Sequence, residues 1–345
     1  MGIIGRHSFE LCSRPRIISS ASYVGDKEGK GPLRECFDKI CRDDTLGLDS
    51  WEQAESRMFE SAVRVALAKI KRQSDDLSCL LGGDLLNQII SSGFAAREIR
   101  APFIGLYGAC SNISEGLMLG GMLVDGGFAE LAACAASSHF SAAERQFRYP
   151  LEMGVQAVPS SQRTVTGAGS IIIQAAGEFR PGAGNVFEHV ALTGGTIGSV
   201  GDFGITDANN MGAAMAPAAF KTIKTHLSDY SRRVEDYDRI ITGDLGIFGS
   251  DMLYELLRGE GIEIADRHED CGKLMFSPEQ NVNCGASGCG CAATVMSSWF
   301  LPKIESGEIR RVLFLATGAL MSPVSSLQGE SIPSIAHAVV IEHID

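Results

Sequence analysis

The feature of this sequence that most restricts its fold is an internal repeat, in which four segments of the first half return in the same order in the second half. The four pairs are residues 83–85 with 243–245, 108–111 with 285–288, 130–136 with 311–317, and 168–173 with 335–341. Strands that alternate with helices in this way predict parallel βαβ units. The ordered repeat therefore predicts two α/β halves related by a pseudo-twofold axis, residues 1–180 and 181–345.

Hydrophobic periodicity and turn residues predict the remaining elements. We expect strands at 16–21, 77–81, 102–107, 130–136, 164–175, 190–193, 239–242, 311–317 and 335–341, and helices at 54–71 and around 218–226. A further helical segment should follow Leu85 and end near Arg97. The strand at 102–107 is expected to be short and buried.

Cys110 lies on a glycine-flanked turn between the strand at 102–107 and a helix. Asn112 and Glu115, three residues apart, have the spacing of a capping box, which would place Cys110 within a turn of the helix start. Backbone N–H groups and the positive end of the helix dipole favour a thiolate or a bound carboxylate there. The helix is apolar around most of its circumference, so it should lie in the centre of the molecule, where Cys110 faces the second half. The alternative is that Cys110 has no functional role and is only a small buried residue, because free cysteine is often buried.

Composition excludes several classes of protein. The chain has 345 residues and a formal net charge of −12, which argues against a nucleic-acid partner. Ten cysteines at this length, with no signal-peptide core in residues 1–16, indicate a reducing compartment. The uncharged run at 280–302 contains too many glycines and polar residues to be a transmembrane helix.

Neither a metal nor a cofactor is predicted. The spacing of Cys284, Cys289 and Cys291 matches no common zinc pattern, and the glycine-rich segment 193–201 lacks the order of strand, Gly-x-Gly-x-x-Gly and helix that dinucleotides require. Asp84 and Asp244 each follow a strand, where the structural interpretation is that they cap the next helix.

Several segments carry a resemblance to known proteins. They include PLRECFD, DSWEQAESRM, GGDLLNQIISSGFAAREI, PFIGLYGACS, SSHFSAAERQFRYPLE, NMGAAMAPAA, YDRIITGDLG, GASGCGCAA and ATGALMSP. A duplicated α/β chain with a cysteine at such an elbow resembles the thiolase fold of thiolases and ketoacyl synthases. The segments together are similar to the stage V sporulation protein AD family.

The resemblance implies a five-layer αβαβα arrangement and a protein that binds dipicolinic acid (pyridine-2,6-dicarboxylic acid), with calcium chelation left open. It further implies work with other stage V sporulation A proteins at the cytosolic face of the spore inner membrane, to which the chain would be attached peripherally. Whether it forms a homodimer is also open.

Condensing enzymes of this fold pair the cysteine with a histidine and an asparagine, or with two histidines, from the second half. The histidine follows the strand equivalent to 239–242, where this chain has Gly243 and Asp244, and the second residue precedes the helix after Gly285. None of the seven histidines falls at either place. The resemblance therefore implies a binding protein with no catalytic residues. The alternative is an acyl transferase that uses Cys110 as its nucleophile.

For the ligand, two separated anchors and a flat apolar wall are expected above Cys110. Helix-end N–H groups at Ser111 and Asn112 would hold one carboxylate. The candidates for the second anchor are Ser138, His139, Arg145 and Arg148, and those for the wall are Phe140 and Phe147. The alternatives are purely structural. His139 would be a loop residue whose hydrogen bonds are satisfied by its neighbours, and both arginines would belong to surface ion pairs.

Overall fold

The computed structural model describes residues 2–147 and 157–345. In these ranges most strands join into one 13-stranded sheet. The strands of its first half are β1 (Gly2–Ile4), β2 (Ser8–Glu10), β3 (Arg16–Val24), β4 (Lys39–Ile40), β5 (Cys79–Gly83), β6 (Phe103–Gly105), β7 (Leu131–Ser138) and β9 (Gly167–Gln174). Those of the second half are β10 (Val190–Thr196), β11 (Arg239–Thr242), β12 (His268–Asp270), β14 (Arg311–Ala319) and β15 (Ser334–His343). A separate pair, β8 (Arg163–Thr164) and β13 (Ala286–Ser287), connects the two halves.

The strand order repeats within the sheet. One part runs β3-β9-β7-β5-β6 and the other β10-β15-β14-β11-β12, and the two parts meet where Arg16 of β3 pairs with Ala191 of β10. The inner pairs β5–β7 and β11–β14 are parallel, as expected. The parallel pairing does not extend to the whole sheet, because β9 and β15 run antiparallel to the neighbours on both sides. The division of the chain at residue 180 stays a prediction.

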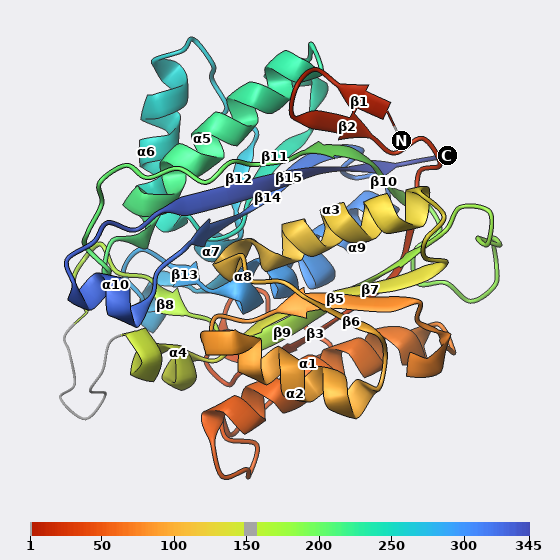
Figure 1. The fold of residues 1–345 in the computed structure, drawn as a ribbon, viewed down its shortest axis with the longest axis horizontal. Helices are drawn as coiled ribbons and strands as arrows, with labels where there is room; N and C mark the ends of the chain where they lie inside the picture. Colours follow the sequence, from red (N-terminus) through yellow and green to blue (C-terminus); the bar gives the residue numbers. More distant parts are fainter. Residues whose placement is uncertain (1, 148–156) are drawn as a thin grey trace.

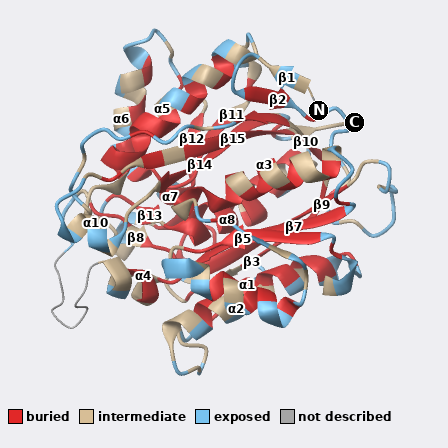
Figure 2. Ribbon diagram, in the orientation of Figure 1, coloured by how far each residue is buried: buried red, intermediate tan, exposed pale blue. Residues whose placement is uncertain are grey.

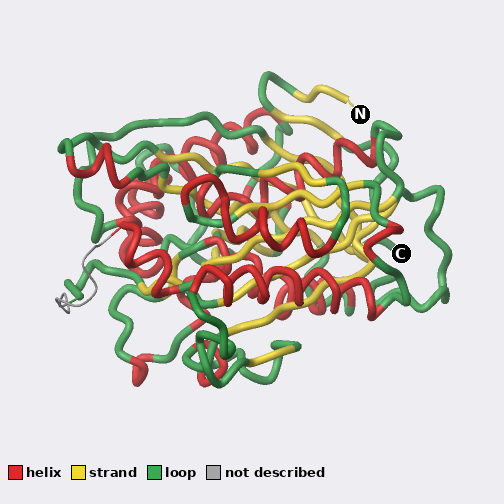
Figure 3. The backbone as a smooth tube through the Cα atoms, turned by 60° about the horizontal axis from the view of Figure 1, so that its bottom comes forward, coloured by secondary structure: helices red, strands yellow, loops and turns green. Residues whose placement is uncertain are grey.

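Five layers are visible in Figure 1, with two helical layers outside, two sheet layers, and one helical layer between the sheets. The outer helices are α1 (Trp51–Lys69) and α2 (Ile90–Ile99) on one side, and α5 (Met211–Asp229) and α6 (Gly246–Arg258) on the other. The central layer holds α3 (Asn112–Asp125) and α8 (Cys289–Val295), which contact each other. The backbone trace in Figure 3 shows the same enclosure of strands by helices. The shorter helices are α4 (Phe140–Phe147), α7 (Cys271–Met275), α9 (Leu301–Glu305) and α10 (Pro323–Leu327).

Small residues let α3 occupy the central layer, where most of the chain is buried (Figure 2). A Cβ atom at Gly120 would lie 2.9 Å from the Cys134 sulfur, and one at Gly121 would lie 2.9 Å from a Leu11 methyl group. Both distances are shorter than ordinary van der Waals contact, so glycine is needed where this helix touches β7 and the N-terminal segment. This contact fixes the depth at which the N-terminus of α3, with Cys110, sits between the sheets.

Two local expectations need correction. The segment 102–107 is not a buried strand, because β6 is the last strand of the sheet and Ile104 is 41% exposed. The helix expected around 218–226 begins at Met211, where the Asn210 side chain accepts a hydrogen bond from the Ala213 N–H, and it continues through Pro217. Among the described residues, no helix combines the length and apolarity needed to cross a bilayer.

Candidate functional site

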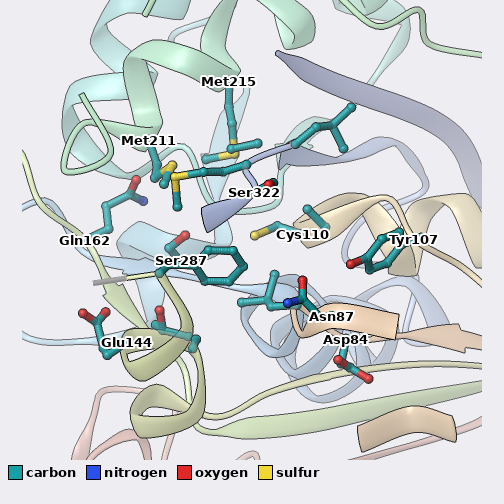
Figure 4. Close-up of a pocket in the computed structure, with 18 residues that line it drawn as sticks. Asp84, Asn87, Tyr107, Cys110, Glu144, Gln162, Met211, Met215, Ser287 and Ser322 are labelled. Carbon is teal, nitrogen blue, oxygen red and sulfur yellow. The ribbon is translucent and has the colours of Figure 1, made fainter. Parts of the chain in front are cut away.

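A cavity of about 330 Å³ opens above Cys110, between the two halves of the chain. Tyr107, Cys110 and Phe147 from the first half and Met211 and Met215 from the second contribute to its wall. In Figure 4 the Cys110 sulfur points toward the middle of this space, with Met211 and Met215 on one side and Asn87 on the other. None of the described residues that line the cavity is Lys, Arg or His, whereas Asp84 and Glu144 are among them.

The turn that carries Cys110 is held by side chains on either side of it. Ala109 has a positive φ of 51°, which an L-residue adopts only when its surroundings hold it there. The Gly108 N–H donates to Asn112 Oδ1 at 2.7 Å, and Ser111 Oγ donates to the Gly108 carbonyl at 2.7 Å. The predicted capping box is wrong, since the N-cap of α3 is Ser111 and makes no side-chain cap. Asn112 is already helical, and its carboxamide oxygen binds the turn instead.

Asp244 is the buried group that faces Cys110 from the second half. Asp244 Oδ2 accepts hydrogen bonds from Ser287 Oγ at 3.0 Å and from the Gly288 N–H at 2.9 Å. Asp244 Oδ1 accepts from Thr317 Oγ1 at 3.0 Å, and the Cys110 thiol also hydrogen-bonds to the Asp244 side chain. Burial raises the pKa of Asp244 from 3.8 to about 6. Asp244 therefore meets four donors, and no described residue forms a salt bridge with it.

The capping interpretation holds for Asp84 and fails for Asp244. Asp84 Oδ1 accepts from the Leu86 N–H and its Oδ2 from the Ser92 N–H in the first turn of α2, both at 2.8 Å. For α6, the helix that follows Asp244, the first N–H groups donate to Asp270 instead, at 2.8 Å from Leu245 and 2.9 Å from Gly246. Asp270 thus frees Asp244 to turn toward Cys110.

The Cys110 thiol is not activated by its position at the start of α3. A hydrogen bond with Cys289 lowers its pKa, but burial and the charge of Asp244 act in the opposite direction and leave the pKa above its ordinary value. A raised pKa keeps the sulfur protonated at neutral pH, and a protonated thiol is a poor nucleophile. The expectation of a thiolate at this helix end is therefore wrong, because the nearest charge is a carboxylate.

Comparison with known proteins identifies the family. The sequence profile described as Stage V sporulation protein AD (SpoVAD) matches residues 5–342. A relative from Bacillus subtilis (strain 168), Stage V sporulation protein AD, is 43% identical over 343 residues, which make up 99% of this chain and 98% of the relative. The chain belongs to the stage V sporulation protein AD family. Its membership confirms the resemblance inferred from the sequence segments.

Solved structures similar to this family member are thiolase-like enzymes. A variant of OleA from Xanthomonas campestris matches with a TM-score of 0.59 at 13% identity, covering 99% of each chain. Human mitochondrial 3-ketoacyl-CoA thiolase, in complex with CoA, matches with a TM-score of 0.59 at 10% identity, covering 98% of this chain and 100% of that one. For 3-oxoacyl-[acyl-carrier-protein] synthase III from Aquifex aeolicus VF5 the TM-score is 0.53 at 11% identity, with 95% and 100% covered. These matches confirm the thiolase-like fold, and identities this low carry no function with them.

Apart from the candidates for the apolar wall, Cys110 alone among the described residues that we predicted to bind ligand in this SpoVAD family member lines the cavity. Ser111 and Asn112 lie buried beside it and hold its turn. Ser138 Oγ donates to the Val165 carbonyl at 2.6 Å and accepts from the Gly290 N–H at 3.1 Å, so it joins the halves behind the cavity.

The basic candidates lie elsewhere. His139 Nε2 contacts the Asp44 carbonyl at 2.8 Å and its Nδ1 accepts from the Ser141 N–H, while burial lowers its pKa, so it is a neutral residue satisfied by its neighbours. Arg145 forms an ion pair with Glu52 and lies over the Trp51 ring. Arg148 lies outside the described residues. Of the two wall candidates Phe147 lines the cavity, and Phe140 lies next to it in a second, smaller cavity.

Sequence reasoning missed Gln162 and assigned Asp244 the wrong role. Gln162 is 7% exposed, and its Nε2 donates to the carbonyls of Asp244 and Ala286, both at 2.8 Å, whereas its Oε1 has no hydrogen-bond partner among the described residues. No local signal marks Gln162. For Asp244 the resemblance to condensing enzymes was a signal, since it implied that the residue stands where those enzymes have a catalytic histidine.

Proposed function

We propose that this chain binds dipicolinic acid without changing it chemically, and that it takes part, with other stage V sporulation A proteins, in the uptake of dipicolinic acid into the developing spore. It would act at the cytosolic face of the spore inner membrane, held there by those proteins. The observation that supports a binding role most directly is the pairing of a protonated Cys110 with the buried Asp244 beneath a preformed cavity.

Acyl transfer, the alternative function, finds little support in this arrangement. A thiol nucleophile needs a base or a positive environment, and the oxyanion that forms on acyl transfer needs hydrogen-bond donors. Asp244, at the position where condensing enzymes of this fold have histidine, supplies a buried carboxylate instead. A carboxylate would oppose the developing negative charge, and an oxyanion-site donor normally contributes about 3–4 kcal/mol to catalysis.

The cavity suits a small planar aromatic ligand. Its volume of about 330 Å³ falls at the lower end of the range for small-molecule sites. Leu85, Phe147, Met211 and Met215 provide apolar walls, and methionine adapts well to flat rings. Polar groups at Asn87 and Ser287 are available for orientation.

The charges around the cavity favour one form of the ligand. Free dipicolinate carries two negative charges near neutral pH, and the described lining offers it Asp84 and Glu144 but no basic side chain. The 1:1 calcium chelate is neutral, so it avoids the repulsion that the free dianion meets in a poorly solvated cavity. We therefore propose that the chelate is the form bound in this cavity.

Isothermal titration calorimetry on variants of Cys110 tests the proposal. Cys110→Trp should abolish binding of calcium dipicolinate because the indole fills the cavity, whereas Cys110→Ala should have a mild effect. Cys12→Trp, at an exposed cysteine, is the matched control and should bind like the unaltered protein. Undiminished affinity in a folded Cys110→Trp protein would mean that the ligand binds elsewhere. Steady release of a condensation or hydrolysis product from acyl-CoA, lost in Cys110→Ala, would support the acyl transferase instead.

A further inference from the structure

A second cavity, of about 150 Å³, adjoins the central one and is lined by basic side chains as well as by Glu144. The two cavities share Gln162 and Glu144, which in Figure 4 lie on the side of the central cavity away from Tyr107. The lining of the second cavity includes the basic residues Lys27 and Arg163. It also includes a hydroxyl and side-chain amides, from Ser161, Asn209, Asn281 and Asn283. The described lining of the central cavity has no basic side chain, whereas the second cavity has two, Lys27 and Arg163.

Arg163 is placed firmly by contacts of its backbone and of its guanidinium. Its guanidinium carbon lies 3.7 Å from the centroid of the Phe140 ring, and its backbone N–H donates to the Gly285 carbonyl at 2.9 Å. Its Nε is buried and makes no hydrogen bond within residues 2–147 and 157–345. A guanidinium that is fixed by stacking loses little conformational freedom when its N–H groups bind an anion.

Lys27 and Arg163 are close enough to repel each other. Burial, and then the charge of Arg163, lower the pKa of Lys27. Like charges that share a cavity destabilise a protein unless an anion lies between them. The carboxylates that reduce this repulsion are Glu28, Asp44 and Glu144, all of which interact with Arg163.

These carboxylates match the two cations in charge, but within the described residues none of them lies within salt-bridge distance of Lys27 or Arg163. Glu28 is 1% exposed, its Oε1 accepts from the Thr166 N–H at 3.1 Å, and burial raises its pKa from 4.5 to about 7. It is therefore about half protonated at neutral pH. Attraction for an anion therefore comes from direct contact with the N–H groups of the two cations and not from a net positive charge. A doubly charged phosphate would be repelled by Glu144 and Asp44 more strongly than a group with one negative charge.

We propose that the cavity between Lys27 and Arg163 is an anion-binding site that takes a single carboxylate group of a small organic acid. The guanidinium presents a planar fork that matches the two oxygens of a carboxylate, and the amide of Asn209, which also lines the cavity, adds a donor. This inference does not depend on dipicolinate being the ligand of the central cavity.

Thermal unfolding at matched ionic strength, with acetate, malonate, inorganic phosphate or chloride as the added anion, tests the site in the full-length protein. Acetate and malonate should raise the Tm more than chloride and phosphate do. In Lys27→Gln and Arg163→Gln this gain should disappear, and titration should show the dissociation constant for malonate weakened by about tenfold or more. Arg163→Lys keeps the charge but loses the fork, so it should recover only part of the affinity.

Arg34→Gln is the matched control, because it removes one positive charge at an exposed residue paired with Glu35. It should respond to malonate like the unaltered protein, as should Cys110→Trp, whose central cavity is filled. Equal responses to all four anions, or an undiminished response in both Lys27→Gln and Arg163→Gln, would overturn the proposal. A stronger response to phosphate than to malonate would overturn the assignment to carboxylates. Loss of the response in Cys110→Trp would show that the anion binds in the central cavity instead.

Discussion

Replacing Asp244 with Asn tests the electrostatic argument on which the central site depends. The pKa of Asp244 is about 6 in the folded protein and 3.8 in its ordinary state, because the carboxyl is buried. The folded chain therefore holds this proton more tightly than the unfolded chain does. By linkage, stability is lost as pH rises from about 4 to about 6, and the loss is fully present above pH 6. At 1.36 kcal/mol for each pKa unit, the penalty amounts to about 3 kcal/mol.

Asp244→Asn removes this ionisation but keeps the shape of the side chain. The carboxamide NH₂ will face donors such as Ser287 Oγ, the Gly288 N–H or Thr317 Oγ1, which costs about 1–3 kcal/mol for each donor left unsatisfied. That cost does not vary with pH, so it separates cleanly from the ionisation. Relative to the variant, the unaltered protein should lose about 3 kcal/mol of stability between pH 4 and pH 8.

The assay is urea unfolding at several pH values between 4 and 8 for both proteins, with the difference in unfolding free energy plotted against pH. Buried acids that do not interact with Asp244, such as Glu55, titrate in both proteins and cancel in this difference. A difference that does not change with pH would refute the argument, since it would show that Asp244 has no raised pKa. The reactivity of Cys110 provides a second measurement, because removing the negative charge should lower the pKa of the thiol.

Three further outcomes are expected. Iodoacetamide should alkylate Cys110 of the unaltered protein more slowly than it alkylates the exposed Cys12, and Cys110 should react faster in Asp244→Asn than in the unaltered protein. Peptide mass spectrometry measures both rates, and a Cys110 that reacts as fast as Cys12 at pH 7 would contradict the protonated thiol. Because burial raises the pKa of Glu28 in the folded protein, the unaltered protein should lose about 3 kcal/mol of stability between about pH 4.5 and 7, and Glu28→Gln should not show this loss. If the unfolding free energies of the two proteins change with pH in the same way, the prediction is contradicted. His139→Ala leaves the Asp44 carbonyl and the Ser141 N–H without their hydrogen-bond partner, so it should lower the unfolding free energy by about 1–3 kcal/mol. The affinity for calcium dipicolinate should not change, and a loss of affinity in the folded variant would show that His139 binds the ligand.

Much of the fold could be read from the chain because its signals are local or repeated. Gly-Asp-Leu at 83–85 and 243–245 marks equivalent ends of β5 and β11, and the all-round apolar character of residues 113–124 correctly predicts a central helix. The family resemblance extends this prediction to the layered arrangement. The direction of β9 and β15 was missed, since alternation of strands and helices indicates their order and not which neighbour each strand pairs with.

The central site was only partly predictable, because its chemistry arises between segments far apart in the chain. A cysteine at a helix start has the same sequence whether a cation or a carboxylate faces it, and here Asp244 is brought against Cys110 by the second half of the fold. Whether Asp244 caps its own helix depends on Asp270, whose carboxylate already accepts those N–H groups. In the same way, the His139 ring is bound by the Asp44 carbonyl, and beside Lys27 the Nε of Arg163 has no hydrogen-bonding partner within the described residues. The sequence by itself determined the family, the repeat and the position of Cys110, since these depend on residue order alone. The tertiary structure decided the charge, protonation and availability of each side chain, because these depend on burial and on neighbours distant in sequence.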